Sequence, residues 1–252
     1  MIKLKSKTEI GALREAGRLA AMAQNLVASL VGPGVTTLEL DEAVCGFLRS
    51  HGAESAFKNY RGFPGNICSS INEEIVHGIP SKRKLKEGDI VSVDVGVRYK
   101  RYIGDCARTY SVEPISLEAR NVLDVCEAAL YKAIEVAQPR ERLSTVSRTI
   151  QQYVEGHGLS VVREFTGHGV GAEMHEDPQV PNFVDSRWGF DVKLKPGLVI
   201  AIEPMVNGGT HETSKVIRQN WEVIVTKDGK PSAHFEHTVA ITEDGPVILT
   251  EP

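Results

Sequence analysis

Three apolar segments of this chain alternate in the manner of β-strands, and each of them carries one carboxylate. They are residues 90–95 with Asp94, residues 198–203 with Glu203, and residues 234–239 with Glu236. A carboxylate inside an apolar strand destabilises the fold strongly unless it is paired with a cation or bound to a metal. The chain must therefore fold so that these acids meet compensating positive charge.

The period of two divides each of these segments into two faces. In the first segment three valines share one face, and Ser92 and Asp94 share the other. In the last segment Glu236 shares its face with His234 and Thr238. Each strand thus has an apolar face that helices can cover and an acidic face that is available to a ligand. We expect an α+β fold in which helices cover the outside of a curved antiparallel sheet and ligands lie inside it.

Helix signals occur in pairs along the chain. Residues 6–9 form a capping box, and an apolar stripe at three- and four-residue steps continues from it to Leu30. A second capping box at residues 36–39 begins a helix that should end near Gly52. Residues 117–136 carry the same kind of stripe, and Ser144 is predicted to begin a shorter helix.

The two halves of the chain repeat one order of elements. Each half runs through a long helix, a breaker, a shorter helix and a glycine to strands that carry acids. This order indicates an internal duplication, with repeats at approximately residues 6–111 and 116–250 and a site between them. No linker or low-complexity stretch marks a second independent unit, so residues 1–252 are predicted to form a single domain.

Composition and charge limit the classes of function. A hydrophobic fraction of 41% and a charged fraction of 25% are ordinary for a soluble globular protein. The net charge of −4 argues against a general nucleic-acid binder, DNA included, and the basic run at residues 82–86 is expected to be a solvated loop. The chain has scattered cysteines and no apolar signal or membrane-spanning stretch, which predicts a cytoplasmic protein with reduced thiols.

Further acids and imidazoles lie in glycine-flanked segments. Asp105 follows Ile-Gly, His168 stands between two glycines, and His175 follows seven residues later. Taken singly, such an acid is as consistent with a buried ion pair as with a ligand. Together, carboxylate oxygens and imidazole nitrogen form a hard ligand set that suits two divalent ions of the Mn, Fe, Co or Zn type. Two ions that share carboxylates can acidify a shared water into a nucleophile at neutral pH.

At this point the chain closely resembles the type I methionine aminopeptidases, and the resemblance covers nearly its whole length. The motifs that carry it are Ser70–Glu73, Val76–Pro80, Asp94–Gly96, Gly104–Asp105, Gly167–Gly171, His175–Glu176, Pro178–Asn182, Leu194–Gly197, Ile202–Pro204 and Phe235–Thr238. The resemblance implies the pita-bread fold, with two pseudo-symmetric halves around the site. It also implies removal of the initiator methionine from nascent proteins when the second residue is small.

The resemblance assigns roles to individual residues. The implied metal ligands are Asp94, Asp105, His168, Glu203 and Glu236. His77 is implied to contact the substrate near the scissile amide, and His175 to donate to the carbonyl oxygen as it becomes an oxyanion. Glu203 is implied to take a proton from the attacking water and to help pass it to the leaving amine.

A pocket for the methionine side chain is implied as well. Its expected lining is Phe57, Tyr60, Phe63, Cys68, Met174 and Trp221. Aromatic rings and sulfur suit a thioether because both are polarizable. Three positions depart from the commonest pattern of the family: Phe57 replaces a cysteine, Met174 a phenylalanine, and His234 a glutamine. Asn72, Glu74 and Ser232 resemble the monovalent-cation site of some family members.

Rival functions remain open from the sequence. The first is a proline-directed peptidase of the same fold, which normally carries an additional N-terminal domain for which this chain has no room. A type II methionine aminopeptidase usually has a helical insertion that does not fit between His175 and Glu236. The last is a metal-free peptide-binding relative, against which the intact ligand set argues. The family is usually monomeric, and the basic run at residues 82–86 is a candidate for transient contact with the ribosome.

Overall fold

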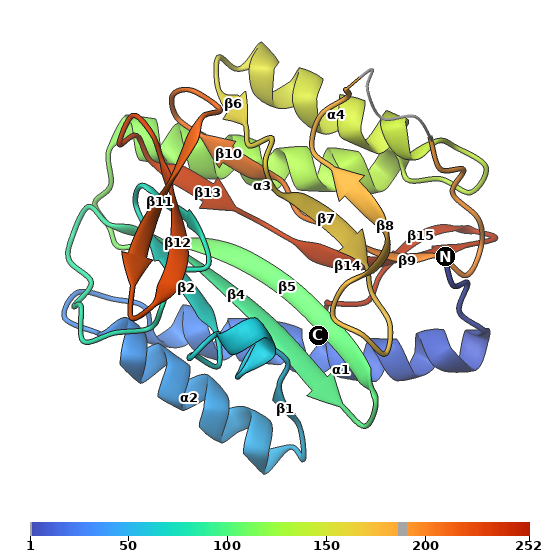
Figure 1. Cartoon of the computed structure of the whole chain (residues 1–252), viewed down its shortest axis with the longest axis horizontal. Coiled ribbons are helices and arrows are strands. Elements are labelled where there is room, and N and C mark those ends of the chain that lie inside the picture. Colours follow the sequence, from blue (N-terminus) through green and yellow to red (C-terminus); the bar gives the residue numbers. More distant parts are fainter. Residues whose placement is uncertain (1, 186–190) are drawn as a thin grey trace.

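The computed structural model describes residues 2–185 and 191–252, and its strands lie between two pairs of helices (Figure 1). The helices of the described residues are α1 (Lys7–Leu30), α2 (Thr37–Ser50), α3 (Leu117–Val136) and α4 (Leu143–Gly156). Figure 1 shows α1 and α2 along one side of the strands and α3 and α4 along the opposite side. The first pair comes from the first half of the sequence, and the second pair comes from the second half.

The first half contributes five strands and a short 3₁₀ turn among the described residues. They are β1 (Glu54–Ser55), the turn Tyr60–Gly62, β2 (Cys68–Ile71), β3 (Glu74–Val76), β4 (Ile90–Tyr99) and β5 (Tyr102–Ser111). The strands β4 and β5 form a long antiparallel hairpin, and β2 pairs with the other edge of β4.

The second half contributes ten strands among the described residues, and none of them is longer than six residues. They are β6 (Ser160–Val161), β7 (Thr166–Gly169), β8 (Glu176–Pro181), β9 (Val199–Ile202), β10 (Met205–Asn207), β11 (Thr213–Arg218), β12 (Trp221–Thr226), β13 (Ser232–His234), β14 (His237–Thr242) and β15 (Gly245–Ile248). They form the sheets β15-β14-β9-β7-β8 and β13-β10-β6, while β11 and β12 join β3 of the first half.

Antiparallel pairing between helix layers confirms the predicted α+β class. Each strand pair in the described part of the chain is antiparallel. Both predicted capping boxes are present, with Ser6 at α1 and Thr36 at α2, and α3 has the predicted bounds. α2 and α4 are both 14 residues long and follow the long helix of their own half. The duplication itself stays a prediction, because a shared order of elements does not establish common descent.

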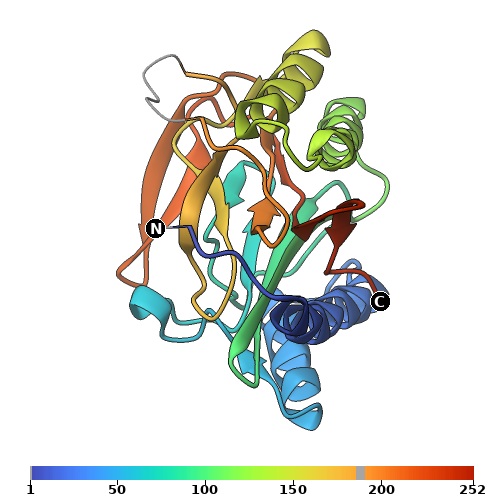
Figure 2. The same ribbon diagram turned by 90° about the vertical axis from the view of Figure 1, so that its right-hand side faces the viewer.

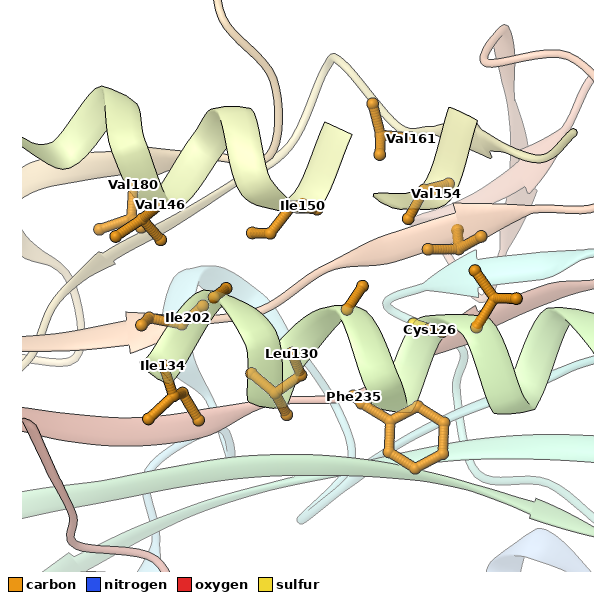
Figure 3. Close-up of a cluster of buried hydrophobic side chains, with 14 of the residues drawn as sticks. Cys126, Leu130, Ile134, Val146, Ile150, Val154, Val161, Val180, Ile202 and Phe235 are labelled. Carbon is orange, nitrogen blue, oxygen red and sulfur yellow. The ribbon is translucent and has the colours of Figure 1, made fainter. Parts of the chain in front are cut away.

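The apolar faces of the strands pack against the helices of their own half. Val91, Val93 and Val95 of β4 are fully buried in a cluster with residues of α1 and α2. In the second half, Leu198, Ile200 and Ile202 belong to the cluster formed by α3 and α4. Figure 3 shows Leu130 and Ile134 of α3 beneath Val146 and Ile150 of α4. The alternation in the sequence therefore identified the covered faces correctly.

The segment 234–239 was predicted as one strand, and the structure corrects this. The chain leaves β13 after His234 and enters β14 at His237, so Phe235 and Glu236 lie between two different sheets. The amide of Glu236 donates instead to the carbonyl of Ala107 in β5, at 2.9 Å. Glu203 lies at a similar break between β9 and β10, where Pro204 has no amide hydrogen to donate.

The helix predicted to begin at Ser144 begins one residue earlier, at Leu143. Its N-cap, Arg142, makes no side-chain hydrogen bond to the helix. The carboxylate of Asp191 accepts from the amide of Ser144 at 3.0 Å and from its hydroxyl at 2.7 Å. An acid 47 residues away in sequence thus accepts from one amide of the first turn, and local sequence could not reveal this contact.

The basic run at residues 82–86 exposes its lysines, as its composition predicts. Lys82, Lys84 and Lys86 are exposed, in agreement with a solvated loop. Among the helices described, none combines the length and apolar character needed to cross a lipid bilayer.

Helix α1 lies so close to neighbouring backbone that two glycines are required. A Cβ at Gly17 would lie 2.2 Å from the carbonyl oxygen of Leu249, and a Cβ at Gly104 of β5 would lie 2.4 Å from the amide nitrogen of Gly17. The buried Gln24 of the same helix donates to the carbonyls of Val93 and Cys106, at 2.9 Å each. These contacts hold α1 against β4, β5 and the end of the chain (Figure 2).

Gly17→Ala should lower the free energy of unfolding by about 1–3 kcal/mol, because the added methyl group overlaps backbone that cannot rotate away. Gly11→Ala, in the exposed part of the same helix, is the matched control. A Cβ there meets nothing within 4 Å, and helix propensity should raise stability by about 1 kcal/mol. Urea denaturation measures both changes, and shifts of the same sign would contradict the close approach at Gly17.

Candidate metal centre

Two of the predicted ligands come from the long hairpin of the first half. In the β4–β5 register Asp94 lies opposite Ala107 and Asp105 lies opposite Gly96, so the two acids are diagonal neighbours on one face. The hydroxyl of Thr238 donates to the carbonyl of Asp105 at 2.8 Å and accepts from its amide at 3.2 Å. The hairpin is therefore fixed to β14 of the second half at the position of one acid.

The other three predicted ligands come from the second half. His168 lies in β7, while Glu203 and Glu236 occupy the two strand breaks. The side-chain amide of Asn182 donates to the carbonyl of Glu203 at 3.0 Å. Nδ1 of His168 is 3.0 Å from the carbonyl oxygen of Gly169, and a proton placed on Nδ1 leaves the Nε2 lone pair facing the acids.

The ligand atoms of this group have the spacing of donors around a cation. Those of Asp105, His168 and Glu236 all lie within 4.8 Å of one another. Nε2 of His168 is 3.6 Å from Oδ2 of Asp105 and 3.5 Å from Oε1 of Glu203. These separations are too long for hydrogen bonds. Two donors on one tetrahedral ion, with bonds of the usual length, are separated by about 3.4 Å, which is close to the observed spacing.

Burial makes the acids of this group unfavourable in their charged form. It raises the pKa of Asp94 and of Glu203 to about 7, and it raises the pKa of Asp105 and Glu236 well above the ordinary range. Within the described residues, one oxygen of each of Asp94, Asp105 and Glu236 is buried without a hydrogen-bond partner. These orphaned acceptors fit divalent cations, which would supply both the missing charge and the missing partners.

The two further histidines lie beside this group and are held by aromatic rings. Nδ1 of His175 is 2.8 Å from the hydroxyl of Tyr60, and the centroids of the His175 and His168 rings are 4.2 Å apart. The His77 ring meets Phe165 and Trp221 edge-on. Burial lowers the pKa of His175 to about 3, with His168 as the next cause, and it lowers the pKa of His77 to about 4. Both imidazoles are therefore neutral at pH 7.

The direction of the hydrogen bond between Tyr60 and His175 determines which ring nitrogen of His175 carries the proton. When the Tyr60 hydroxyl donates to Nδ1, the ring proton resides on Nε2. In that tautomer His175 offers Nε2–H as a neutral donor, and Nε2 cannot accept a hydrogen bond. Sequence reasoning placed Tyr60 in the pocket but did not predict this contact, because it joins residues 115 positions apart.

One cavity of about 640 Å³ contains the acids, the histidines and all the predicted pocket residues. Its apolar lining from the sequence prediction is Phe57, Tyr60, Phe63, Cys68, Met174 and Trp221. The Phe63 ring meets the Trp221 ring at 5.2 Å and the Phe57 ring at 6.5 Å between centroids. The structure thus brings every one of these residues to the lining of the cavity that also contains the acids.

Phe57 depends on a glycine in the strand that carries Asp94. A Cβ at Gly96 would lie 2.6 Å from the Phe57 ring, so only glycine leaves room for a phenylalanine here. Cys68 lies directly opposite Asp94 in the β2–β4 register. Burial raises the pKa of the Cys68 thiol, and the negative charge of Asp94 raises it further. The thiol is therefore neutral and serves as an apolar wall.

The structure also shows lining residues that the sequence did not single out. The outer wall includes Arg61, Glu164, Phe165, Lys215 and Glu222. The last two form an ion pair of 2.7 Å on the β11–β12 hairpin, which closes one side of the cavity. Phe165 precedes the Gly-His-Gly segment by two residues, and this proximity in sequence was the only available signal.

Asn72 and Ser232 are adjacent, as the resemblance implies for a monovalent-cation site. The amide of Ser232 donates to the carbonyl of Asn72 at 2.9 Å. The Asn72 side chain is bonded to Asp89 and to the amide of Ile90, and the Ser232 hydroxyl is bonded to Asn207. Cation binding by these residues, with Glu74, stays a prediction.

His237 lies next to Glu236 but faces away from the acids. Its Nδ1 is 2.8 Å from the Thr250 hydroxyl, and its Nε2 is 3.3 Å from the Tyr131 hydroxyl. Both ring nitrogens therefore have partners in the outer layer, which agrees with the alternation predicted for this segment.

Comparison with known proteins agrees with this geometry. The profile of metallopeptidase family M24 matches residues 11–243. The chain is 50% identical over 250 residues to methionine aminopeptidase 1 of Bacillus subtilis (strain 168), with 99% of each chain covered. It is 48% identical to a methionine aminopeptidase of Clostridium perfringens, also over 99% of each chain.

Solved structures give the same result. A crystal structure of the methionine aminopeptidase of Thermotoga maritima superposes with a TM-score of 0.95, at 42% identity and full coverage of both chains. Prolidase from Pyrococcus furiosus superposes with a TM-score of 0.80 at 24% identity, and the match covers 99% of this chain but 65% of that one. The second likeness shows a shared fold alone.

The ion-free protein should become less stable as pH rises from about 4 to about 7. In the folded state Asp94 and Glu203 keep their protons up to about pH 7, whereas in the unfolded chain they lose them near pH 4. The folded state therefore binds more protons in this window, and its advantage is lost as pH rises. Urea denaturation at several pH values measures how the free energy of unfolding changes with pH. The series is done once with a chelator and once with saturating Mn²⁺ or Co²⁺. Added metal should flatten the slope, and equal slopes in both conditions would contradict cation binding by these acids.

Proposed function

This chain belongs to metallopeptidase family M24, and we propose that it hydrolyses the first peptide bond of chains that begin with methionine. It is a hydrolase of the aminopeptidase class, which releases the N-terminal methionine when the second residue is small. The observation that carries the proposal is the group of buried acids with orphaned oxygens at one wall of an apolar cavity.

The acids would hold two divalent ions in this proposal. Asp105 and Glu236 would be shared between the ions, Asp94 would hold one of them, and His168 with Glu203 would hold the other. When bound, such ions acidify a shared water and polarise the carbonyl of the scissile bond. Support comes from the burial of Asp105 and Glu236 and from the donor spacing around Nε2 of His168. The choice among Co, Mn, Fe and Zn is not decided by these ligand types.

Three residues of the chain would act directly on the substrate. The carboxylate of Glu203 would take a proton from the attacking water and return it to the leaving amine. Nε2–H of His175 would donate to the carbonyl oxygen as negative charge develops on it. His77 would contact the substrate near the scissile amide, and its carbonyl already accepts from the Trp221 indole at 3.2 Å.

The apolar wall would receive the methionine side chain. Phe57, Phe63 and Trp221 supply ring edges and faces, while Cys68 and Met174 supply sulfur. A flexible thioether makes favourable contacts with both kinds of surface. Because the rings are packed against one another, we expect the pocket to keep its shape without a ligand.

Two alternatives fit less well. A proline-directed peptidase of the same fold is represented by relatives near 24% identity, against 50% for a methionine aminopeptidase. In a metal-free peptide-binding relative, buried acids that lack partners would destabilise the fold with no cation to compensate them.

We further propose that the enzyme works as a cytoplasmic monomer on nascent chains. The free cysteines and the exposed basic loop at residues 82–86 support this setting. A monovalent cation at Asn72, Glu74 and Ser232 belongs to the same proposal.

Cleavage of a peptide series tests the function. With Co²⁺, Mn²⁺ or Fe²⁺ supplied, kcat/KM for peptides Met-X-Ser should be highest when X is Gly, Ala or Ser. It should fall at least about tenfold when X is Lys or Leu, because the residue after methionine must fit against the confined wall beside the acids. Equal kcat/KM across the series would contradict the assigned specificity, and no cleavage with any metal would favour the peptide-binding alternative.

His175→Ala should lower kcat by roughly a hundredfold while the protein keeps its metal and its fold, since an oxyanion donor is lost. Tyr60→Phe, which removes the hydroxyl and keeps the ring, should lower kcat less. Asp105→Ala is the contrasting variant and should lose metal and activity together. Steady-state kinetics with elemental analysis separate the three outcomes, and a near-normal kcat for His175→Ala would remove it from the reaction.

Neutralising the basic loop should weaken ribosome binding. Lys82, Lys84 and Lys86 replaced by alanine should reduce co-sedimentation with ribosomes at low salt, because phosphate contacts supply this kind of affinity. The matched control neutralises three exposed lysines elsewhere, Lys7, Lys193 and Lys195. Equal loss in both variants would show that the contact is not specific to the loop.

A further inference from the structure

His234 is a buried imidazole beside the acids that none of the assigned roles uses. It is 2% exposed, and its Nε2 has no hydrogen-bond partner among the described residues. Nε2 lies 3.6 Å from Oε2 of Glu203, and the residue lines the same cavity as the predicted ligands. A buried polar atom without a partner is unfavourable, so this nitrogen is placed for something that enters the cavity.

The backbone holds His234 firmly in this position. It is the last residue of β13, where it pairs with Met205 of β10, two residues after Glu203. Its amide donates to the Thr109 hydroxyl at 2.9 Å, and that hydroxyl lies 2.9 Å from its carbonyl oxygen. The strand pairing that places Glu203 therefore also places His234.

The separation between His234 and Glu203 does not represent a hydrogen bond. At 3.6 Å it exceeds the usual range for a nitrogen donor and a carboxylate oxygen. It is equal to the separation between Nε2 of His168 and Oδ2 of Asp105, and close to the 3.5 Å from His168 to Glu203. The Glu203 carboxylate thus lies between two imidazoles, with His168 at Oε1 and His234 at Oε2.

We propose that Nε2 of His234 is a sixth ligand of the metal centre, a nitrogen donor that binds a divalent ion together with Oε2 of Glu203. The inference rests on the proposed function only in requiring that the acids bind divalent ions. A second imidazole changes the chemistry of the ligand set, because nitrogen donors favour Zn, Co and Fe over Mg and Ca. The neighbouring His237, with both ring nitrogens bonded in the outer layer, shows the contrasting arrangement of a structural histidine.

The test compares His234→Gln with two control variants. Glutamine keeps a polar side chain of similar reach and can hydrogen-bond to Glu203, but its amide is a weak metal ligand. His211→Gln removes an exposed imidazole, and His237→Gln removes a buried one that faces away from the acids. Calorimetric titration of each metal-free protein with Co²⁺ and Zn²⁺, with elemental analysis of stoichiometry, measures the affinity of each ion.

His234→Gln should weaken one binding step by at least about tenfold, whereas both controls should match the parent protein. In the Co²⁺-loaded parent, paramagnetically shifted ring resonances should come from two histidines, and in His234→Gln from one. Unchanged affinity together with unchanged shifted resonances would overturn the proposal, even if kcat falls, and would leave His234 as a hydrogen-bonding neighbour of Glu203. These readouts do not use peptide cleavage, so a parent protein that binds metal but cleaves nothing would contradict the proposed function and not this inference.

Discussion

Several carboxylates lie together between the two halves of the structure, and the rest of the fold must compensate for removing them from water. Asp94 and Asp105 come from one hairpin, while Glu203 and Glu236 come from two strand breaks on the other side. Their mutual repulsion and loss of hydration oppose folding, and burial is the largest cause of each raised pKa. Favourable packing must offset this penalty, and the valine face of β4 under α1 and α2 supplies it on the first side. The cluster of α3 and α4 supplies it on the second side.

The strand breaks explain how opposing acids reach a common point. A continuous strand would present Glu236 in the plane of a single sheet, but the chain passes from β13 to β14 and bonds instead to Ala107 of β5. Pro204 interrupts the other pair of strands next to Glu203, whose carbonyl is held by Asn182. Irregular backbone therefore occurs where side chains from different sheets must converge, and the surrounding strands fix its geometry.

Much of this arrangement could be predicted from the sequence. Capping boxes at Ser6 and Thr36 gave the helix starts, because those signals lie within four residues of the helix they begin. The alternation around Asp94 gave the covered face of β4 for the same local reason. The role of Asp191 at α4, the contact from Tyr60 to His175 and the approach of His234 to Glu203 could not be predicted. Each of them joins residues that only the tertiary fold brings together.

Burial shifts the pKa values of the acids and of His77 and His175 in opposite directions. In both cases it favours the uncharged form of the group in the ion-free protein. It raises the pKa of Asp94 and Glu203 to about 7 and lowers those of His77 and His175 to about 4 and about 3. Protons on the acids can therefore be exchanged for metal charge near neutral pH at little cost. His77 and His175 remain neutral at pH 7, so His175 can donate its ring N–H without adding a positive charge that would repel bound ions. A protonated His175 would stand 4.2 Å, ring to ring, from His168, so its low pKa is a condition for placing a donor so close to a proposed metal ligand.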